Sequence, residues 1–181
     1  MEDETITQIL SEGGIGAIAT DTGYSLIALA LDPQAVWKVY QAKHRDPRNP
    51  FTVLISEIDE LERFGVVLNP DLISELSSYW PGPYSIILPT IDEQFEYLHR
   101  GTDTIAFRIP DDEELRSFIK ETGPIIAPSA CPEGMEPAET AQMVRSYFGT
   151  DLNFVIDSGP HDETPVTILR NTEDGIEVVR E

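Results

Sequence analysis

The residues best suited to chemistry in this chain are the cations of one short segment. Lys43, Arg45 and Arg48 lie close together, and Lys38 precedes them. The rest of the chain is strongly acidic, with 33 Asp and Glu against 12 Lys and Arg and a net charge of −21. Cations gathered in such a chain indicate a bound anion, although cations at a helix end also complement the helix dipole. We therefore expect a phosphate or carboxylate clamp here.

Two further features point to a small polar ligand. Thr20, Asp21 and Thr22 form a hydroxyl-rich turn after a short apolar segment. Such a turn binds a small zwitterion or a phosphate, or simply joins two strands. Arg108 interrupts the apolar run at 104–109, and a cation in a buried strand needs a partner. A core salt bridge and a ligand contact are both open for Arg108, and we favour the ligand.

A loop rich in Pro and Gly follows the apolar run at 125–128 and contains Ser129 and Cys131. Loops at strand ends often carry sites in α/β proteins. Cys131 is the single cysteine and has no histidine nearby in sequence, which favours a structural thiol over a nucleophile. The three histidines are scattered, which argues against zinc, and we predict no resident metal site.

Length and composition indicate one folded domain over residues 1–181, with 40% hydrophobic residues. The net charge disfavours non-specific binding to nucleic acid or to an anionic membrane. There is no cationic leader before an apolar run and no apolar stretch long enough to span a bilayer. We therefore expect a cytoplasmic protein without membrane association.

Strands and helices interleave along the chain. We expect strands at 15–19, 26–31, 51–55, 84–88, 104–109, 125–128, 154–157, 164–169 and 176–180. We expect helices at 4–11, from 33 to before 47, at 56–64, 70–79, 111–122 and 138–148, and a loop at 92–103. Some strands follow one another without a helix between them. The pattern therefore predicts an α/β (α+β) fold with a mixed sheet flanked by helices.

The chain has no Walker motif, Rossmann fingerprint or nucleophile elbow. Several segments together resemble the Sua5, YrdC and YciO family, the L-threonylcarbamoyladenylate synthases. They are ATDTGYSL at 19–26, KHRDPRNPFTVLI at 43–55, YWPGPYSIIL at 79–88, TIAFRIP at 104–110, APSACPEG at 127–134, TPVTIL at 164–169 and VVR at 178–180. The resemblance implies a twisted mixed parallel and antiparallel sheet around a large, positive central cavity. It also implies a single YrdC-like domain without the C-terminal domain of longer Sua5 proteins.

The same resemblance implies a nucleotidyltransferase that joins L-threonine, bicarbonate and ATP, with Mg²⁺, into threonylcarbamoyl-AMP and pyrophosphate. A tRNA-modifying transferase complex would then place the threonylcarbamoyl group on adenosine 37 of tRNA, the t6A modification. By position, the catalytic residues would be Lys43 and Arg45. The threonine contacts would be Thr22, Arg108 and Thr164. The ATP contacts would be Arg45, Asn49, Thr104, Ser129, Cys131 and Arg180.

Three departures from the family pattern leave an alternative open. Cys131 stands in place of the asparagine of the Ser-x-Asn signature, and a thiol hydrogen-bonds weakly. His44 replaces the glycine of Lys-Gly-Arg, and Ser25 replaces the glycine of Tyr-Gly-Leu. The alternative is a YciO-like paralogue that binds nucleotide or RNA, has weak or no synthase activity, and acts in ribosome or rRNA maturation. The net charge counts against extended RNA contact, so RNA binding would be weak.

Overall fold

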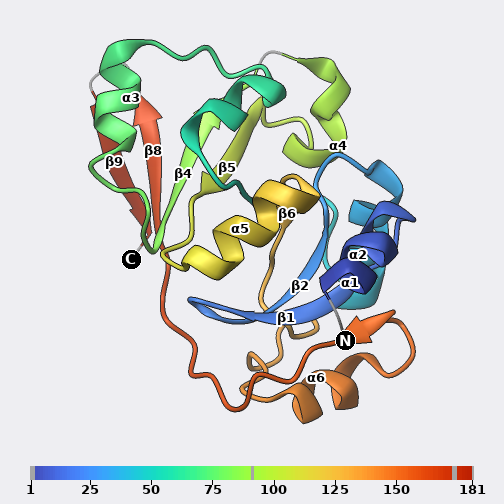
Figure 1. The fold of residues 1–181 in the computed structure, drawn as a ribbon. Helices are drawn as coiled ribbons and strands as arrows, with labels where there is room; N and C mark the ends of the chain where they lie inside the picture. Colours follow the sequence, from blue (N-terminus) through green and yellow to red (C-terminus); the bar gives the residue numbers. More distant parts are fainter. Residues whose placement is uncertain (1–2, 91, 173–174, 181) are drawn as a thin grey trace.

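The centre of the protein is one mixed sheet, as the sequence predicted (Figure 1). The computed structural model describes residues 3–90, 92–172 and 175–180. The strands are β1 (Gly16–Thr20), β2 (Gly23–Leu29), β3 (Thr52–Leu54), β4 (Tyr84–Pro89), β5 (Thr104–Arg108), β6 (Ile125–Ile126), β7 (Phe154–Val155), β8 (Thr167–Thr172) and β9 (Gly175–Arg180). Over the described residues they form a nine-stranded sheet in the order β7-β1-β2-β6-β3-β5-β4-β8-β9. The pairs β1–β7, β3–β5 and β4–β8 are parallel and the other pairs are antiparallel.

Helices and irregular segments cover both faces of this sheet (Figure 1). The helices are α1 (Asp3–Ser11), α2 (Pro33–Lys43), α3 (Pro70–Leu76), α4 (Glu96–His99), α5 (Glu113–Thr122) and α6 (Ala141–Phe148), with short 3₁₀ helices η1 (Ile58–Phe64) and η2 (Glu93–Phe95). Successive side chains of a strand point to opposite faces. Accordingly, Ile27 of β2 packs in one apolar cluster with α1 and α5, whereas Leu26 and Ala28 belong to a larger cluster that includes α2. Each face of the sheet therefore has its own core.

Capping residues begin α2 and α3 where the sequence predicted, and α5 two residues later than predicted. Asp32 caps α2 through its carboxylate, with Pro33 in the first turn. Asn69 caps α3 by accepting the N–H of Leu72 at 2.9 Å. Asp112 caps α5 in the same way. Each side chain satisfies a backbone N–H that the first helical turn leaves without a partner. No helix in the described part of the chain is long and apolar enough to cross a membrane.

Some predicted elements differ in type or extent. The helix expected at 56–64 is the 3₁₀ helix η1, and the helix expected at 70–79 ends at Leu76. The loop expected at 92–103 contains η2 and α4. This prediction was wrong because Phe95 and Leu98 are apolar anchors within a polar stretch, and both are buried in the core. Tertiary packing can stabilise short helices that a polar composition does not predict.

The strand expected at 164–169 is displaced toward the C-terminus and begins at Thr167. Pro165 has no N–H with which to join a ladder. The N–H of Thr164 donates instead to the carbonyl of Thr22 at 3.2 Å, outside the sheet. This stretch therefore lies against the β1–β2 hairpin, and only the residues that follow it pair with β4.

The end of α2 determines where the predicted cation segment begins. His44 has a left-handed backbone, with φ of 51°. Its N–H donates to the carbonyl of Gln41, and the N–H of Arg45 donates to the carbonyl of Tyr40, each at 3.1 Å. This is the Schellman arrangement, in which glycine is usual because a Cβ atom is unfavourable in the left-handed region.

We expect His44→Gly to stabilise the protein by about 0.5–1 kcal/mol, since relief of the left-handed strain exceeds the added freedom of glycine in the unfolded chain. Urea titration of the two proteins measures the difference in free energy of unfolding. His44→Ala is the matched control, because it removes the imidazole and keeps the Cβ atom. An equal gain in both variants would show that the imidazole, and not the backbone, carries the strain.

Candidate functional site

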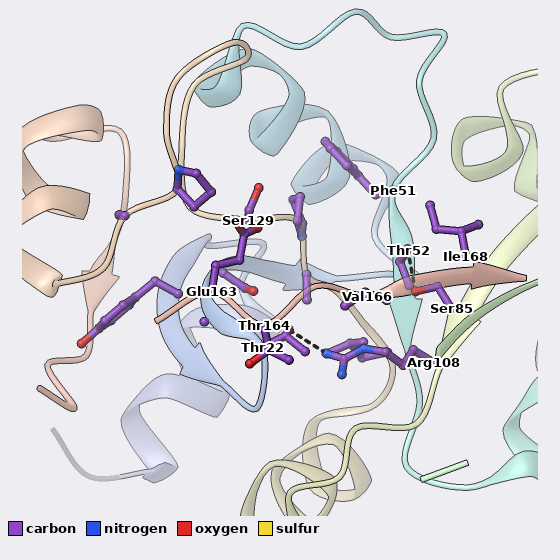
Figure 2. Close-up of a pocket in the computed structure, with 18 of the residues that line it drawn as sticks. Thr22, Phe51, Thr52, Ser85, Arg108, Ser129, Glu163, Thr164, Val166 and Ile168 are labelled. Atoms are coloured by element: carbon purple, nitrogen blue, oxygen red, sulfur yellow. Dashed lines mark hydrogen bonds between the residues drawn. The ribbon is translucent and has the colours of Figure 1, made fainter. Parts of the chain in front are cut away.

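A cavity of about 510 Å³ opens beside the β1–β2 hairpin, within the usual size range of small-molecule sites. Its walls come from the hairpin, β3, the end of β5, the segment after β6, the loop before α6 and the residues leading into β8. Figure 2 shows Thr22, Thr164 and Arg108 grouped at one part of this cavity. The hairpin, β5 and the segment before β8 are remote in sequence, so the fold alone brings them together.

Arg108 forms an ion pair and also lines the cavity. Its side chain is only 4% exposed, and Nη1 donates to both carboxylate oxygens of Asp21 at 2.9 and 2.8 Å. Nη2 donates to Oγ1 of Thr22 at 3.3 Å. Burial lowers the pKa of Arg108, and the charge of Asp21 opposes that shift. The sequence left two alternatives open for Arg108, a salt bridge and a position in a ligand cleft. The structure shows that this side chain does both: it pairs with Asp21 and it lines the cavity.

The residues predicted to contact threonine lie beside one another. Thr22 and Thr164 both line the cavity and are joined through the backbone. Oγ1 of Thr22 lies 3.2 Å from Oγ1 of Thr20, which in turn donates to the carbonyl of Gly23 at 2.8 Å. Nη2 of Arg108 adds a guanidinium N–H donor next to these hydroxyls. Such a group suits a carboxylate ligand that also carries a hydroxyl.

Lys43 lies inside the protein. It is 2% exposed, and its ammonium donates to the carbonyls of Ser129 and Cys131. Burial lowers the pKa of Lys43 from 10.5 to about 8; nearby Cys131 and Glu133 oppose this shift and Arg45 adds to it. The Lys43 side chain is not part of the cavity wall. Lys43, which was predicted to be catalytic, thus links the end of α2 to the loop after β6 through hydrogen bonds.

The other cations of the predicted cluster separate in the structure. Arg45 lines the cavity. Arg48 has a side chain that is 87% exposed and pairs with Asp46 at 2.6 Å. Lys38 donates to the carbonyl of Gly13 at 2.6 Å. The cluster inferred from the sequence is therefore not a single anion site, because only Arg45 among these four cations reaches the cavity.

The predicted ATP contacts also divide. Ser129 and Arg180 line the cavity together with Arg45. Cys131 is buried, and its Sγ lies 3.5 Å from Oγ of Ser129. The two remaining predicted contacts, Asn49 and Thr104, lie outside the cavity wall.

Those two side chains are held elsewhere. Asn49 is exposed, and its amide donates to Glu133 at 3.4 Å. Thr104 begins β5, at the opposite end of the strand from Arg108, and donates to Oγ1 of Thr102 at 3.1 Å. The geometry thus supports a cavity contact for Ser129 more directly than for Asn49 or Thr104.

The sequence did not predict the acidic part of the wall. Glu136, Glu139 and Glu163 line the cavity as well as its three arginines, so the described lining residues carry equal numbers of formal positive and negative charges. A positive cavity stays a prediction, because the field inside it also depends on charges that do not line it. The sequence did show these glutamates, but nothing in their spacing distinguished them from the other surface carboxylates. In the described residues, no group of three or more His, Cys, Asp or Glu is placed to hold a metal ion.

With this geometry in view, comparison with known proteins identifies the family. The Sua5/YciO/YrdC family model, described as telomere recombination, matches residues 8–181. This chain belongs to the Sua5/YciO/YrdC family. The predicted resemblance is therefore confirmed over nearly the whole sequence.

Curated relatives of this Sua5/YciO/YrdC chain differ in length. The threonylcarbamoyl-AMP synthase of Pyrococcus abyssi is 32% identical over 151 residues, which are 83% of this chain and 44% of the relative. The synthase of Bacillus subtilis is 32% identical over 154 residues, which are 84% of this chain and 44% of that relative. The synthase of Pseudomonas putida strain GB-1 is 29% identical over 181 aligned residues, and the match covers 97% of this chain and 96% of that relative. The chain thus spans less than half of the first two relatives and nearly all of the third.

Solved structures in the same family share the fold. The P. abyssi Sua5 structure complexed with L-threonine has a TM-score of 0.88 at 28% identity, and the match covers 99% of this chain and 54% of that one. Escherichia coli YciO has a TM-score of 0.84 at 22% identity, covering 99% and 90%. These neighbours confirm the predicted twisted mixed sheet with flanking helices.

The buried Lys43 predicts a specific pH dependence of stability. Its folded-state pKa of about 8 lies below the ordinary 10.5, so the unfolded chain binds more protons between these values. This lysine therefore makes the free energy of unfolding rise as the pH rises from about 8 to 10.5. Relative to Lys43→Met, the wild type should gain up to about 1.4 kcal/mol per pH unit in that window.

Urea titrations of both proteins from pH 7 to 10.5 measure this difference. Lys38→Met is the matched control, because Lys38 lies on the same helix and also donates to a backbone carbonyl. If the difference between the wild type and Lys43→Met stays constant with pH, the ammonium is not destabilised by burial.

Proposed function

We propose that this chain is a threonylcarbamoyl-AMP synthase, a nucleotidyltransferase that uses L-threonine, bicarbonate and ATP. The observation that carries the proposal is the contact of Arg108 with Thr22 in a cavity lined also by Arg45, Ser129 and Arg180. A relative matching nearly its whole length bears the name of this activity. The product would pass to a tRNA-modifying transferase complex in the cytoplasm for the t6A modification.

One end of the cavity suits the amino acid. Asp21 holds Nη1 of Arg108, so that Nη2 lies on the side of Thr22. The guanidinium would bind the threonine carboxylate, and the Thr22 and Thr164 groups would bind the remaining polar atoms. P. abyssi Sua5, which shares this fold, was solved in complex with L-threonine.

The rest of the wall suits the nucleotide. The guanidinium groups of Arg45 and Arg180 would stabilise phosphate charge, and the hydroxyl of Ser129 would donate a hydrogen bond to a phosphate oxygen. Lys43 would act indirectly, because its ammonium holds the carbonyls of Ser129 and Cys131 and so fixes this loop. These residues would set the phosphates at a constant distance from the threonine end.

The reaction requires positioning and charge stabilisation more than covalent catalysis. The threonine amine attacks the carbon of bicarbonate, and water leaves to give the carbamate. A carbamate oxygen then attacks the α-phosphorus of ATP, and the bond to the β-phosphate breaks to release pyrophosphate. Both reactants of the second step are anions, so cationic side chains on the wall would lower the barrier by offsetting their repulsion.

Mg²⁺ would arrive with ATP. Protein sites usually hold this ion through substrate phosphates and one or two carboxylates, with several waters. Glu136, Glu139 and Glu163 supply separate carboxylates on the cavity wall, which fits such a shared role better than a closed protein site. When bound, the ion would neutralise part of the phosphate charge.

A second candidate function is favoured by Cys131. Its thiol stands where the family pattern has an asparagine amide, and it lies only 3.5 Å from the Ser129 hydroxyl. A thiol is a weaker hydrogen-bond donor and acceptor than an amide. A YciO-like paralogue that binds nucleotide or RNA with weak or no synthase activity is therefore the alternative.

Pyrophosphate release separates the two functions. We expect the purified protein, given ATP, Mg²⁺, bicarbonate and L-threonine, to release pyrophosphate only when threonine and bicarbonate are both present. A coupled phosphate assay with each component omitted in turn measures this dependence. Nucleotide binding without threonine-dependent release would instead support the paralogue.

Arg108→Lys tests the amino-acid end. A lysine offers one point charge, so it cannot keep both oxygens of Asp21 and the Thr22 contact. We expect the KM for L-threonine to rise roughly 10- to 100-fold, with the KM for ATP little changed. Steady-state kinetics measure both constants.

The control for Arg108→Lys is Arg116→Lys. Arg116 donates to the carbonyl of Pro110 at 2.7 Å and does not line the cavity. Both constants should stay near their wild-type values in this control. An unchanged threonine KM in Arg108→Lys would remove Arg108 from the amino-acid site.

A further inference from the structure

Four side chains form a row that ends at the cavity, here called the Arg100–Arg45 stack. The Cζ atom of Arg100 lies 4.4 Å from the ring centroid of Tyr40. Tyr40 stacks on Phe51, with centroids 4.1 Å apart and planes inclined by 27°. The Cζ atom of Arg45 lies 5.2 Å from the centroid of Phe51. Both cation–ring distances are within the range of a favourable contact.

The stack connects the protein interior to the cavity wall. Arg45 and Phe51 line the cavity, whereas Tyr40 is fully buried behind them. Figure 2 shows Phe51 at the rim of the group of labelled residues. Arg100 follows α4, which packs against α2. Arg45 at the cavity thus packs on the ring of Phe51, which stacks on Tyr40, and Tyr40 in turn contacts Arg100.

Tyr40 also supports Arg45 through hydrogen bonds. The Tyr40 hydroxyl donates to the backbone carbonyl of Asn49 at 3.1 Å. Nε of Arg45 donates to the same carbonyl, also at 3.1 Å. A carbonyl oxygen has two lone pairs and can accept both donors. In addition, the backbone carbonyl of Tyr40 accepts the N–H of Arg45 at 3.1 Å.

We propose that Tyr40 is a positioning residue that orients the Arg45 guanidinium before a phosphate group binds. A long arginine side chain loses rotamer freedom when it is ordered, and a support formed in advance removes that loss from the binding step. The inference rests on the proposed function only in taking the anion at Arg45 to be a nucleotide phosphate.

A purely structural role for Tyr40 makes a different prediction. Any buried tyrosine hydroxyl needs an acceptor, and a carbonyl elsewhere in the core would serve. Tyr97 provides this comparison, because its hydroxyl donates to the carbonyl of Ala30 at 2.9 Å and its side chain does not line the cavity. Tyr40→Phe and Tyr97→Phe each remove one hydroxyl that donates to a backbone carbonyl, and only the first affects a carbonyl shared with Arg45.

The direct test observes the Arg45 side chain by ¹⁵N NMR, with its Nε–H signal assigned from Arg45→Gln. In Tyr40→Phe the Asn49 carbonyl is no longer held by the Tyr40 hydroxyl, and we expect this acceptor of the Arg45 Nε–H to become less ordered. We expect exchange of the Arg45 Nε–H with water to become roughly three- to tenfold faster. In Tyr97→Phe that rate should equal the wild-type rate. Equal rates in the wild type and Tyr40→Phe would overturn the proposal.

The kinetic test separates positioning from stability. We expect Tyr40→Phe to raise the KM for ATP roughly three- to tenfold, with the KM for threonine unchanged and with a loss of Tm matching that of Tyr97→Phe. Equal ATP constants in the two variants would contradict the proposal. If the wild type releases no pyrophosphate, the synthase proposal fails, and the NMR measurement alone decides the role of Tyr40.

A second variant covers the case in which Tyr40→Phe does not fold. Arg100→Met removes the first member of the stack and leaves the shared carbonyl, Tyr40 and Arg45 in place. We expect the same changes in Arg45 exchange and ATP KM, about twofold in size, since the contacts of Arg100 with the rings of Tyr40 and Trp37 are lost. No change in either quantity would overturn the role of the stack.

Discussion

The buried ammonium of Lys43 is the interaction on which the cavity depends. A charge removed from water is stable only when hydrogen bonds replace its hydration, and here the carbonyls of Ser129 and Cys131 do so. The contact is reciprocal, because the carbonyl of Lys43 accepts the N–H of Glu133 at 2.8 Å. The end of α2 and the loop after β6 therefore cannot move apart without exposing unsatisfied polar groups. The two cavity residues next to this contact, Arg45 and Ser129, take their relative positions from it.

Two cations of this acidic chain, Lys43 and Arg108, are buried in the described part of the structure. Arg108 neutralises Asp21, and Lys38 bonds to a backbone carbonyl. The described residues of the cavity wall include as many carboxylates as guanidinium groups. At physiological ionic strength, salt screens the interaction between surface charges beyond about 8–10 Å. An anionic substrate would therefore depend on short contacts to individual arginines, which makes the orientation of each guanidinium decisive.

Sequence patterns were most accurate where the cause of a structure is local. Asp32, Asn69 and Asp112 begin helices because a short polar side chain caps the N–H groups of the following turn. Apolar runs predicted all nine strands of the described sheet, with ends that differ by a few residues. The errors came from packing between distant parts of the chain. The helices between 92 and 103 form around buried Phe95 and Leu98, and β8 begins late because Thr164 bonds to the hairpin.

The site shows the same division. The sequence by itself determined which side chains were available for an anion or an amino acid, because residue type sets charge, hydrogen-bonding capacity and reach. It also determined the family, through motifs spread over nearly the whole chain. Only the tertiary structure decided which of those side chains face the cavity. Lys43 meets Ser129 across 86 positions of sequence and Arg108 meets Asp21 across 87, and a charged group's environment is set by such contacts. Residues only two positions apart in sequence, such as Lys43 and Arg45, therefore have different environments, one in the interior and one on the cavity wall.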